Sequence, residues 1–317
     1  MRLRRDDPIE LKSPAQLAIM REAGLVTAAA LRAVTNAVEP GISTAELDAI
    51  AEREIRAAGA VPSFKGYFGF PATICTSVNE QIVHGIPSSE QVLRDGDLLS
   101  IDCGAIVRGW HGDSALTLLV AGTSEDSASQ NRASQNGASQ NGPYSQEELA
   151  GLLHTCELAL WHGLAHAVAG RHLSDISHAV ERAARGAGRY GIIRDYTGHG
   201  IGTEMHMDPP VPNYGRAGRG PVLVPGMALA IEPMLVLGSP QSKVLADDWT
   251  VVTLDGSWAA HFEHTVAVTE DGPVVLTAED GGAAGFAALR AGHIAVPPEQ
   301  VAAAGLTAAA EGAPDGI

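Results

Sequence analysis

The segment GDLLSID, residues 96–102, has a counterpart later in the chain, GMALAIE, residues 226–232. Each copy starts with a glycine and continues as an apolar run typical of a buried strand. Each also carries an acidic residue six positions after the glycine, Asp102 in the first copy and Glu232 in the second. Because a carboxylate in an apolar run is costly to bury without a partner, the pattern predicts a functional site.

Two further patterns accompany each copy in the same order. They are HGI at residues 84–86 and 199–201, and H-x-[DE] at residues 111–113 and 261–263. We infer a duplicated half-domain, with halves over about residues 40–120 and 150–270. A pseudo-two-fold axis would bring together two acids from each half, namely Asp102, Asp113, Glu232 and Glu263. Four carboxylates and a histidine in one place require cations, which indicates a two-metal hydrolase.

The remaining periodicity predicts a mixed α and β protein. Helical spacing of apolar residues covers 14–38, and a second helix begins at the capping box Ser43–Glu46 and ends near Gly59. A similar helix start follows Gly170. Strands are predicted over residues 72–77, 98–106, 114–120, 227–236, 250–254 and 264–269. A hairpin turn at Arg108-Gly109 would place Asp102 and Asp113 on adjacent antiparallel strands.

Composition narrows the class of protein. The chain has 317 residues, 45% of them hydrophobic, and a net charge of −16, which argues against nonspecific nucleic-acid or membrane-surface binding. Its three cysteines form no C-x-x-C pair, which argues against a zinc ribbon and favours a reducing compartment. No apolar run reaches the roughly 18–20 residues that cross a bilayer. We expect a cytoplasmic protein with no nucleic-acid or membrane partner.

Two segments fall outside the repeated pattern. Residues 122–146 contain three copies of Ala-Ser-Gln-Asn, a polar composition that predicts a mobile, low-complexity insert between the halves. Residues 278–317 are rich in alanine and glycine and are expected to be weakly ordered, apart from a short helix over 282–290. Residues 1–277 are expected to form a single catalytic domain.

The candidate ligand set combines carboxylate oxygens with one imidazole. Such a set suits hard or borderline divalent ions such as Mn, Fe, Co or Zn, and two neighbouring ions polarise a carbonyl and activate water. The candidate metal ligands are Asp102, Asp113, His199, Glu232 and Glu263.

From about residue 9 to residue 277 the chain resembles a known family, the type I methionine aminopeptidases of the pita-bread fold. That fold is α+β, with two pseudo-two-fold-related halves whose curved antiparallel sheets are covered by helices. The segments that carry the resemblance are SVNE at 77–80, HGIP at 84–87, SIDCG at 100–104, GWHGD at 109–113, GHGIG at 198–202, AIEPM at 230–234 and FEHT at 262–265.

The resemblance implies a role for each candidate residue. Asp102 would chelate one ion, Asp113 and Glu263 would bridge two divalent ions, and His199 and Glu232 would complete the ligand set of the other ion. Glu232 would also act as general base. His84 would lie near the substrate amide, and His206 would touch the scissile carbonyl. His111, His261 and His264 would lie beside the ligands, and His261 stands where many family members have glutamine.

The same resemblance implies a pocket for the methionine side chain. An apolar, polarisable lining suits a flexible thioether. The lining residues would be Phe64, Tyr67, Phe70, Cys75, Met205 and Trp249.

The implied activity is removal of the initiator methionine from nascent proteins, when the second residue is small and the amine is unformylated. The enzyme would be a monomer that meets nascent N-termini at the ribosome. A proline-specific aminopeptidase or prolidase on the same fold is one alternative, but those enzymes carry a substantial N-terminal domain and the stretch before His84 is short. The type II methionine enzymes carry a late helical insertion, for which the interval from His206 to Glu232 is too short. A metal-free binding protein of this fold is another alternative, but such relatives lose ligands and here all five are present.

Overall fold

The computed structural model describes residues 9–121 and 142–292. Most of the predicted mobile insert and of the C-terminal tail therefore lies outside the described residues. Within the described part, the predicted short helix after residue 282 is present as α6 (Ala283–Ala291). None of the described helices is long and apolar enough to cross a membrane.

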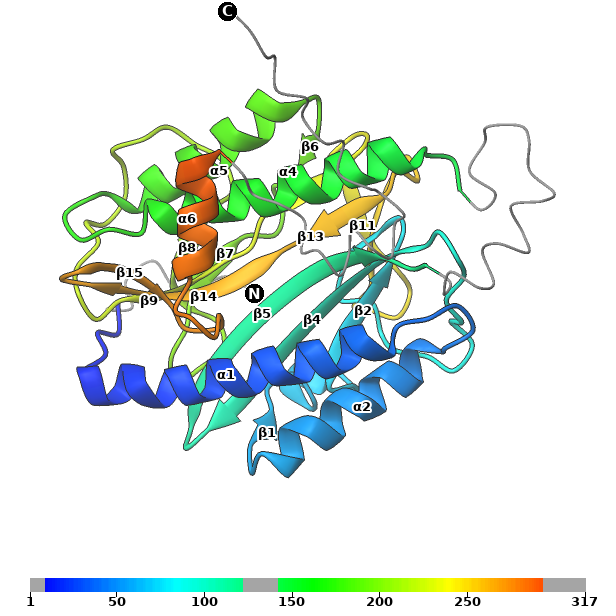
Figure 1. Ribbon diagram of the computed structural model, residues 1–317, viewed down its shortest axis with the longest axis horizontal. Helices are drawn as coiled ribbons and strands as arrows, with labels where there is room; N and C mark the ends of the chain where they lie inside the picture. The colour runs from blue at the N-terminus through cyan, green and yellow to red at the C-terminus, as the bar shows by residue number, and fades with distance from the viewer. Residues whose placement is uncertain (1–8, 122–141, 293–317) are drawn as a thin grey trace, which may run out of the picture.

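One large antiparallel sheet organises the fold (Figure 1). Its central strands lie in the order β2-β4-β5-β14-β9-β7, which is symmetric about the β5–β14 pair. In sequence, β2 (Ile74–Val78), β4 (Leu98–Val107) and β5 (Trp110–Leu119) form the first half, and β7 (Gly198–Gly200), β9 (Ala228–Ile231) and β14 (Glu263–Thr269) form the second. The repeated segments GDLLSID and GMALAIE lead into the corresponding strands β4 and β9, whereas HGI lies at β7 in the second half but follows β3 in the first. The edges are extended by β1 (Val61–Pro62), β8 (Met207–Val211) and β15 (Gly272–Val275).

Each half of the sheet has its own helices. In Figure 1, α1 (Pro14–Ala37) and α2 (Thr44–Ala57) lie side by side along one half, whereas α4 (Gln146–Ala165), α5 (Leu173–Ala187) and α6 lie along the other. The predicted helices over 14–38 and 43–59 are confirmed, and capping boxes at Ser13 and Ser43 explain where they begin. Sequence reasoning did not predict α4, although a third capping box at Ser145 marks its start.

The predicted hairpin is confirmed. Val107 pairs with Trp110 across a turn in which Arg108 and Gly109 both adopt positive φ, 50° and 81°. This is the backbone of a type I′ turn, whose twist matches that of the strands it joins. The hairpin register sets Asp102 opposite Ala115, two positions from Asp113, so both acids lie on one face of the sheet.

The prediction of one strand over 227–236 is wrong. The chain leaves the large sheet after β9 and forms β10 (Met234–Val236), which pairs instead with β13 (Ala259–His261) and β6 (Gly191–Ile192). Pro233 lacks an N–H group and so cannot donate to a continuous ladder. Glu232 therefore lies at the junction between two sheets rather than inside a strand.

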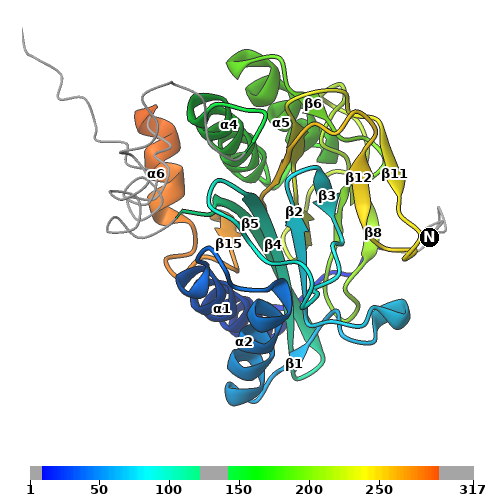
Figure 2. The same cartoon turned by 90° about the vertical axis from the view of Figure 1, so that its right-hand side faces the viewer.

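A second small sheet lies on the side of the molecule away from α1 and α6, as Figure 2 shows. It contains β11 (Ser242–Val244), β12 (Val251–Thr253) and β3 (Gln81–Val83). The interior holds separate apolar clusters for the two halves. Leu47 and Ile101 belong to one, and Leu160 and Ile231 to the other. The candidate site lies on the large sheet and takes its side chains from β4, β5, β14 and β7.

Candidate metal centre and active-site pocket

One cavity brings together all the candidate metal ligands, catalytic residues and pocket residues. It is lined by Phe64, Tyr67, Phe70, Cys75, His84, Asp102, Asp113, His199, Met205, His206, Glu232, Trp249 and Glu263. One part of this lining is carboxylate and imidazole, and the other is aromatic and sulfur-containing. A cavity of this kind suits a ligand with one polar and one apolar end.

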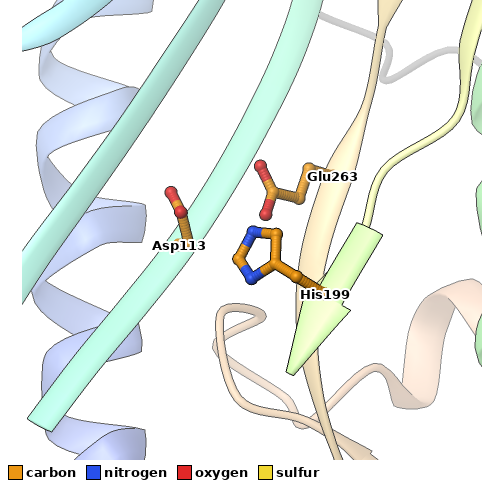
Figure 3. Close-up of side chains that lie close together, drawn as sticks. All are labelled: Asp113, His199 and Glu263. Atoms are coloured by element: carbon orange, nitrogen blue, oxygen red, sulfur yellow. The ribbon is translucent and has the colours of Figure 1, made fainter. Parts of the chain in front are cut away.

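Three of the candidate ligands converge in the centre of the cavity. Asp113 on β5, Glu263 on β14 and His199 on β7 point toward one another (Figure 3), and their potential ligand atoms lie within 4.8 Å of one another. Thr265 holds the two central strands in place. Its hydroxyl accepts from the Asp113 N–H at 3.1 Å and donates to the Asp113 carbonyl at 2.8 Å.

Glu232 and Asp102 extend this cluster. Glu232 Oε1 lies 3.5 Å from His199 Nε2, and the backbone carbonyl of Glu232 accepts a 2.9 Å hydrogen bond from the Asn213 side chain. Asn213 thus fixes the backbone at the break between β9 and β10. Asp102, on β4, lines the same cavity and pairs across the sheet with Cys75.

Asp113 and Glu263 are buried and Asp102 and Glu232 are partly buried, and none of the four pairs with a lysine or arginine among the described side chains. Burial raises the pKa of Asp102 to about 7 and that of Glu232 to about 8. Burial, followed by the charges of neighbouring acids, raises the pKa values of Asp113 and Glu263 well above their ordinary range. Like charges that are held together in a low-dielectric site raise each other's pKa in this way.

The carboxylates also have unused bonding capacity. The buried oxygens Asp102 Oδ1, Asp113 Oδ1 and Glu263 Oε1 have no hydrogen-bond partner. Buried polar atoms are nearly always satisfied, so these oxygens point to a missing partner. Carboxylate oxygens with an imidazole nitrogen are suitable ligands for divalent cations, and the cluster therefore fits them.

Two further histidines face the cluster in neutral form. The Tyr67 hydroxyl lies 2.9 Å from His206 Nδ1, and the His206 ring packs against His199 with centroids 4.3 Å apart. His84 has a left-handed φ of 60° and packs edge-on against Tyr196 and Trp249. Burial lowers the pKa of His84 and of His206 to about 4, which keeps both rings uncharged at neutral pH.

The apolar end of the cavity is a small cluster of its own. Phe64, Phe70, Cys75 and Met205 are each at most 6% exposed, and Tyr67 and Trp249 pack against them. The rings of Phe70 and Trp249 meet edge to face, with centroids 5.0 Å apart. Segments far apart in the sequence thus form one wall.

The histidines predicted to lie beside the ligands have distinct contacts. His111 Nδ1 lies 3.1 Å from the Ser63 hydroxyl, and His264 Nδ1 lies 2.8 Å from the Thr277 hydroxyl. His261 Nε2 lies 3.6 Å from Glu232 Oε2. Sequence reasoning missed the supporting residues Thr265, Asn213 and Tyr196. Thr265 lies two positions after Glu263, but no local pattern marks the other two.

The chain is similar to known proteins over most of its length. Residues 18–270 match metallopeptidase family M24. The chain is 49% identical over 281 residues to methionine aminopeptidase 1 of Mycobacterium tuberculosis, covering 87% of this chain and 97% of that protein. It is 46% identical over 269 residues to the methionine aminopeptidase of Clostridium acetobutylicum, covering 85% of this chain and 98% of that protein.

Solved structures give the same result. The methionine aminopeptidase of Thermotoga maritima superposes with a TM-score of 0.77 and 37% identity, covering 86% of this chain and 100% of that chain. A prolidase from Pyrococcus furiosus, 20% identical with a TM-score of 0.61, shares the fold over 65% of its length. The expected α+β pita-bread fold is thus confirmed. With this match over most of its length and relatives 46 and 49% identical, the chain belongs to metallopeptidase family M24.

Proposed function

We propose that the chain is a methionine aminopeptidase that removes the N-terminal methionine of polypeptides whose second residue is small and whose amine is unformylated. The observation that carries this proposal is the single cavity that joins a carboxylate and histidine cluster to a closed apolar pocket. The similarity to methionine aminopeptidases over most of the chain supports it.

We propose that the cluster holds two divalent ions, of Co, Mn, Fe or Zn. Asp102 would bind one ion, Asp113 and Glu263 would bridge the two, and His199 and Glu232 would bind the other. When bound, such ions supply a Lewis acid for the carbonyl and lower the pKa of water. They would also neutralise the carboxylates that burial otherwise keeps protonated.

The side chains around the cluster have separate tasks. Glu232 has one carboxylate oxygen toward His199 and the other toward His261, and a carboxylate oxygen beside an imidazole keeps a second lone pair, so Glu232 is suited to accept a proton during attack on the methionine carbonyl. His206 lines the cavity, and its ring is oriented by Tyr67. It would donate a hydrogen bond to the scissile carbonyl oxygen as negative charge develops there. His84 lies on the same lining and would contact the scissile amide.

The apolar end of the cavity accounts for the proposed selectivity. Phe64, Phe70 and Cys75 close it, and Trp249 covers Phe70, so a flexible thioether replaces water there. The other end must accept a free α-amine beside the carboxylates. A formyl group would remove the positive charge and add bulk at this end.

We further propose that the substrates are nascent chains met at the ribosome, and that the enzyme acts in the cytoplasm as a monomer. Residues 1–277 would form its single catalytic domain. The test is hydrolysis of Met-Ala-Ser, formyl-Met-Ala-Ser and Ala-Pro peptides after addition of Mn²⁺ or Co²⁺. Cleavage of Met-Ala-Ser alone is expected. Equal cleavage of the formylated peptide, or a preference for Ala-Pro, would contradict the proposal.

A further inference from the structure

His261 is a buried histidine whose backbone is hydrogen-bonded in both directions by one side chain. It is the last residue of β13 and only 2% exposed. The Thr117 hydroxyl, on β5, accepts from the His261 N–H at 2.8 Å and donates to the His261 carbonyl at 2.7 Å. One side chain therefore fixes both backbone groups of His261 relative to the strand that carries Asp113.

The ring of His261 points at a carboxylate but has no hydrogen bond there. Its buried Nε2 has no hydrogen-bond partner and lies 3.6 Å from Glu232 Oε2. On the other side of the same carboxylate, His199 Nε2 lies 3.5 Å from Oε1. The two oxygens of Glu232 thus face two different imidazoles, of which only His199 lies in the cluster with Asp113 and Glu263.

We propose that His261 is a positioning residue, whose Nε2–H donates to Oε2 of Glu232 and fixes the rotation of that carboxylate. An ionised carboxylate only accepts hydrogen bonds, so a neutral imidazole beside it acts as donor. A shift of a few tenths of an ångström brings 3.6 Å into hydrogen-bond range. That bond would satisfy the buried nitrogen and leave Oε1 directed toward His199 and the proposed ions.

This inference rests on the proposed function, because it assigns Glu232 to the metal centre. Partners that orient metal-binding side chains typically contribute about 10–100-fold to metal affinity or activity. A positioning residue needs only a hydrogen-bond donor where Nε2 lies. It does not bind an ion through a lone pair, as a ligand would. A glutamine can supply such a donor, whereas a methionine of the same length cannot.

The experiment therefore compares His261→Gln with His261→Met. Each variant is loaded with Co²⁺, and its affinity is measured by calorimetry, its ligand field by visible absorption, and kcat and KM with Met-Ala-Ser. We expect H261Q to stay close to the parent protein. H261M should lose about 10–100-fold in kcat or Co²⁺ affinity, with little change in KM. The Co²⁺ spectrum should keep its shape in both variants.

Two results would overturn the inference. If H261M matched H261Q in both Co²⁺ affinity and kcat, no positioning bond would exist. If both variants lost one ion or changed the Co²⁺ spectrum, His261 would be a ligand itself. Calorimetry and absorption measure Co²⁺ binding without a peptide. A parent protein that binds Co²⁺ but does not cleave Met-Ala-Ser would therefore contradict the proposed activity and leave the role of His261 testable by metal binding. His166→Gln, at the C-terminal end of α4, is the control for loss of a half-buried histidine elsewhere.

Discussion

Asp113 and Glu263 differ from most buried acids because no lysine or arginine among the described residues pairs with them. Each instead leaves a buried oxygen unsatisfied and faces the other across the β5–β14 boundary. A protein retains such an arrangement at a cost to its stability, since charge burial without a partner is unfavourable. Cation binding removes that cost, which links the energetics of these two residues to their proposed role.

If Asp113 and Glu263 each bind both ions, replacing either one by its neutral isostere should abolish most of the activity. Asp113→Asn and Glu263→Gln should each lower kcat by at least the order of 10²–10³ that loss of one transition-state donor costs. Metal content by elemental analysis and kcat with Met-Ala-Ser would be measured together. Asp175→Asn, which caps the start of α5 outside the cavity, is the isosteric control. A variant that kept both half of the parent kcat and its metal would contradict the assignment.

His84 and His206 should behave differently from His199. Both line the cavity outside the tight cluster, so His84→Ala and His206→Ala should keep their metal and lose on the order of 10²–10³ in kcat. His199→Ala should bind one ion more weakly and regain some activity when metal is added in excess. Titration with Mn²⁺, followed by calorimetry and activity, separates the two cases. If His84→Ala lost metal as readily as His199→Ala, then His84 would be a ligand.

At the scale of elements, the sequence predicted the helices and the hairpin that are set by caps, apolar spacing and turn residues. Helical spacing predicted α1, helical spacing with the Ser43 capping box predicted α2, and the Arg108-Gly109 turn predicted the hairpin that brings Asp102 and Asp113 to one face. The break between β9 and β10 was missed because an apolar run reads as one strand whichever sheet its ends join. Pro233 was the available signal, since a central strand rarely tolerates proline.

The packing of α1 on β5 gives a test at this scale. A Cβ atom added at Gly112 would lie 2.5 Å from the backbone nitrogen of Gly24 in α1, closer than packed atoms approach. Gly112→Ala should therefore push α1 from the sheet and lower the free energy of unfolding by about 1–3 kcal/mol. The measurement is urea unfolding of the parent and variant proteins, with metal present.

Gly186→Ala is the matched control for this substitution. Gly186 lies in α5, and an added Cβ there meets no atom within 4 Å. Alanine in a helix is favoured over glycine by roughly 0.5–1 kcal/mol, so this variant should be slightly more stable than the parent. An unchanged urea midpoint for Gly112→Ala would show that α1 and β5 are not tightly packed at this point.

At the scale of the whole molecule, the duplicated segments carried most of the information. The symmetric strand order explains why residues from two distant halves, such as Asp113 and Glu263, meet at one boundary. The resemblance supplied the pocket, because no periodicity relates Phe64 to Met205 or Trp249. Long-range contacts of this kind depend on how loops pack, and a single sequence does not encode that in its spacing.

The collected carboxylates should also make the stability of the whole protein depend on metal and pH together. Burial raises the folded-state pKa of Asp102 to about 7 and of Glu232 to about 8, above ordinary values near 4. A group whose pKa is raised on folding lowers the stability progressively as pH rises from its unfolded-state pKa to its folded-state pKa, because in that range only the unfolded state has released the proton. The metal-free protein should therefore lose stability between pH 6.5 and 8.5. Buried histidines such as His199, with its pKa lowered to about 3, destabilise the fold only below pH 6.5.

Cations should cancel this loss, because they stabilise the ionised carboxylates that high pH creates. The Tm of protein treated with a chelator should fall from pH 6.5 to 8.5, and the rise in Tm on adding Mn²⁺ should grow over the same interval. Each kcal/mol corresponds to roughly 2–4 °C in a protein of this size, so differential scanning fluorimetry resolves the effect. Asp102→Asn removes one titrating group, so the Tm of this variant without metal should fall less over the same pH interval than that of the parent protein. A metal-free Tm that stayed constant across this interval would mean that the four acids do not share a buried, cation-dependent site.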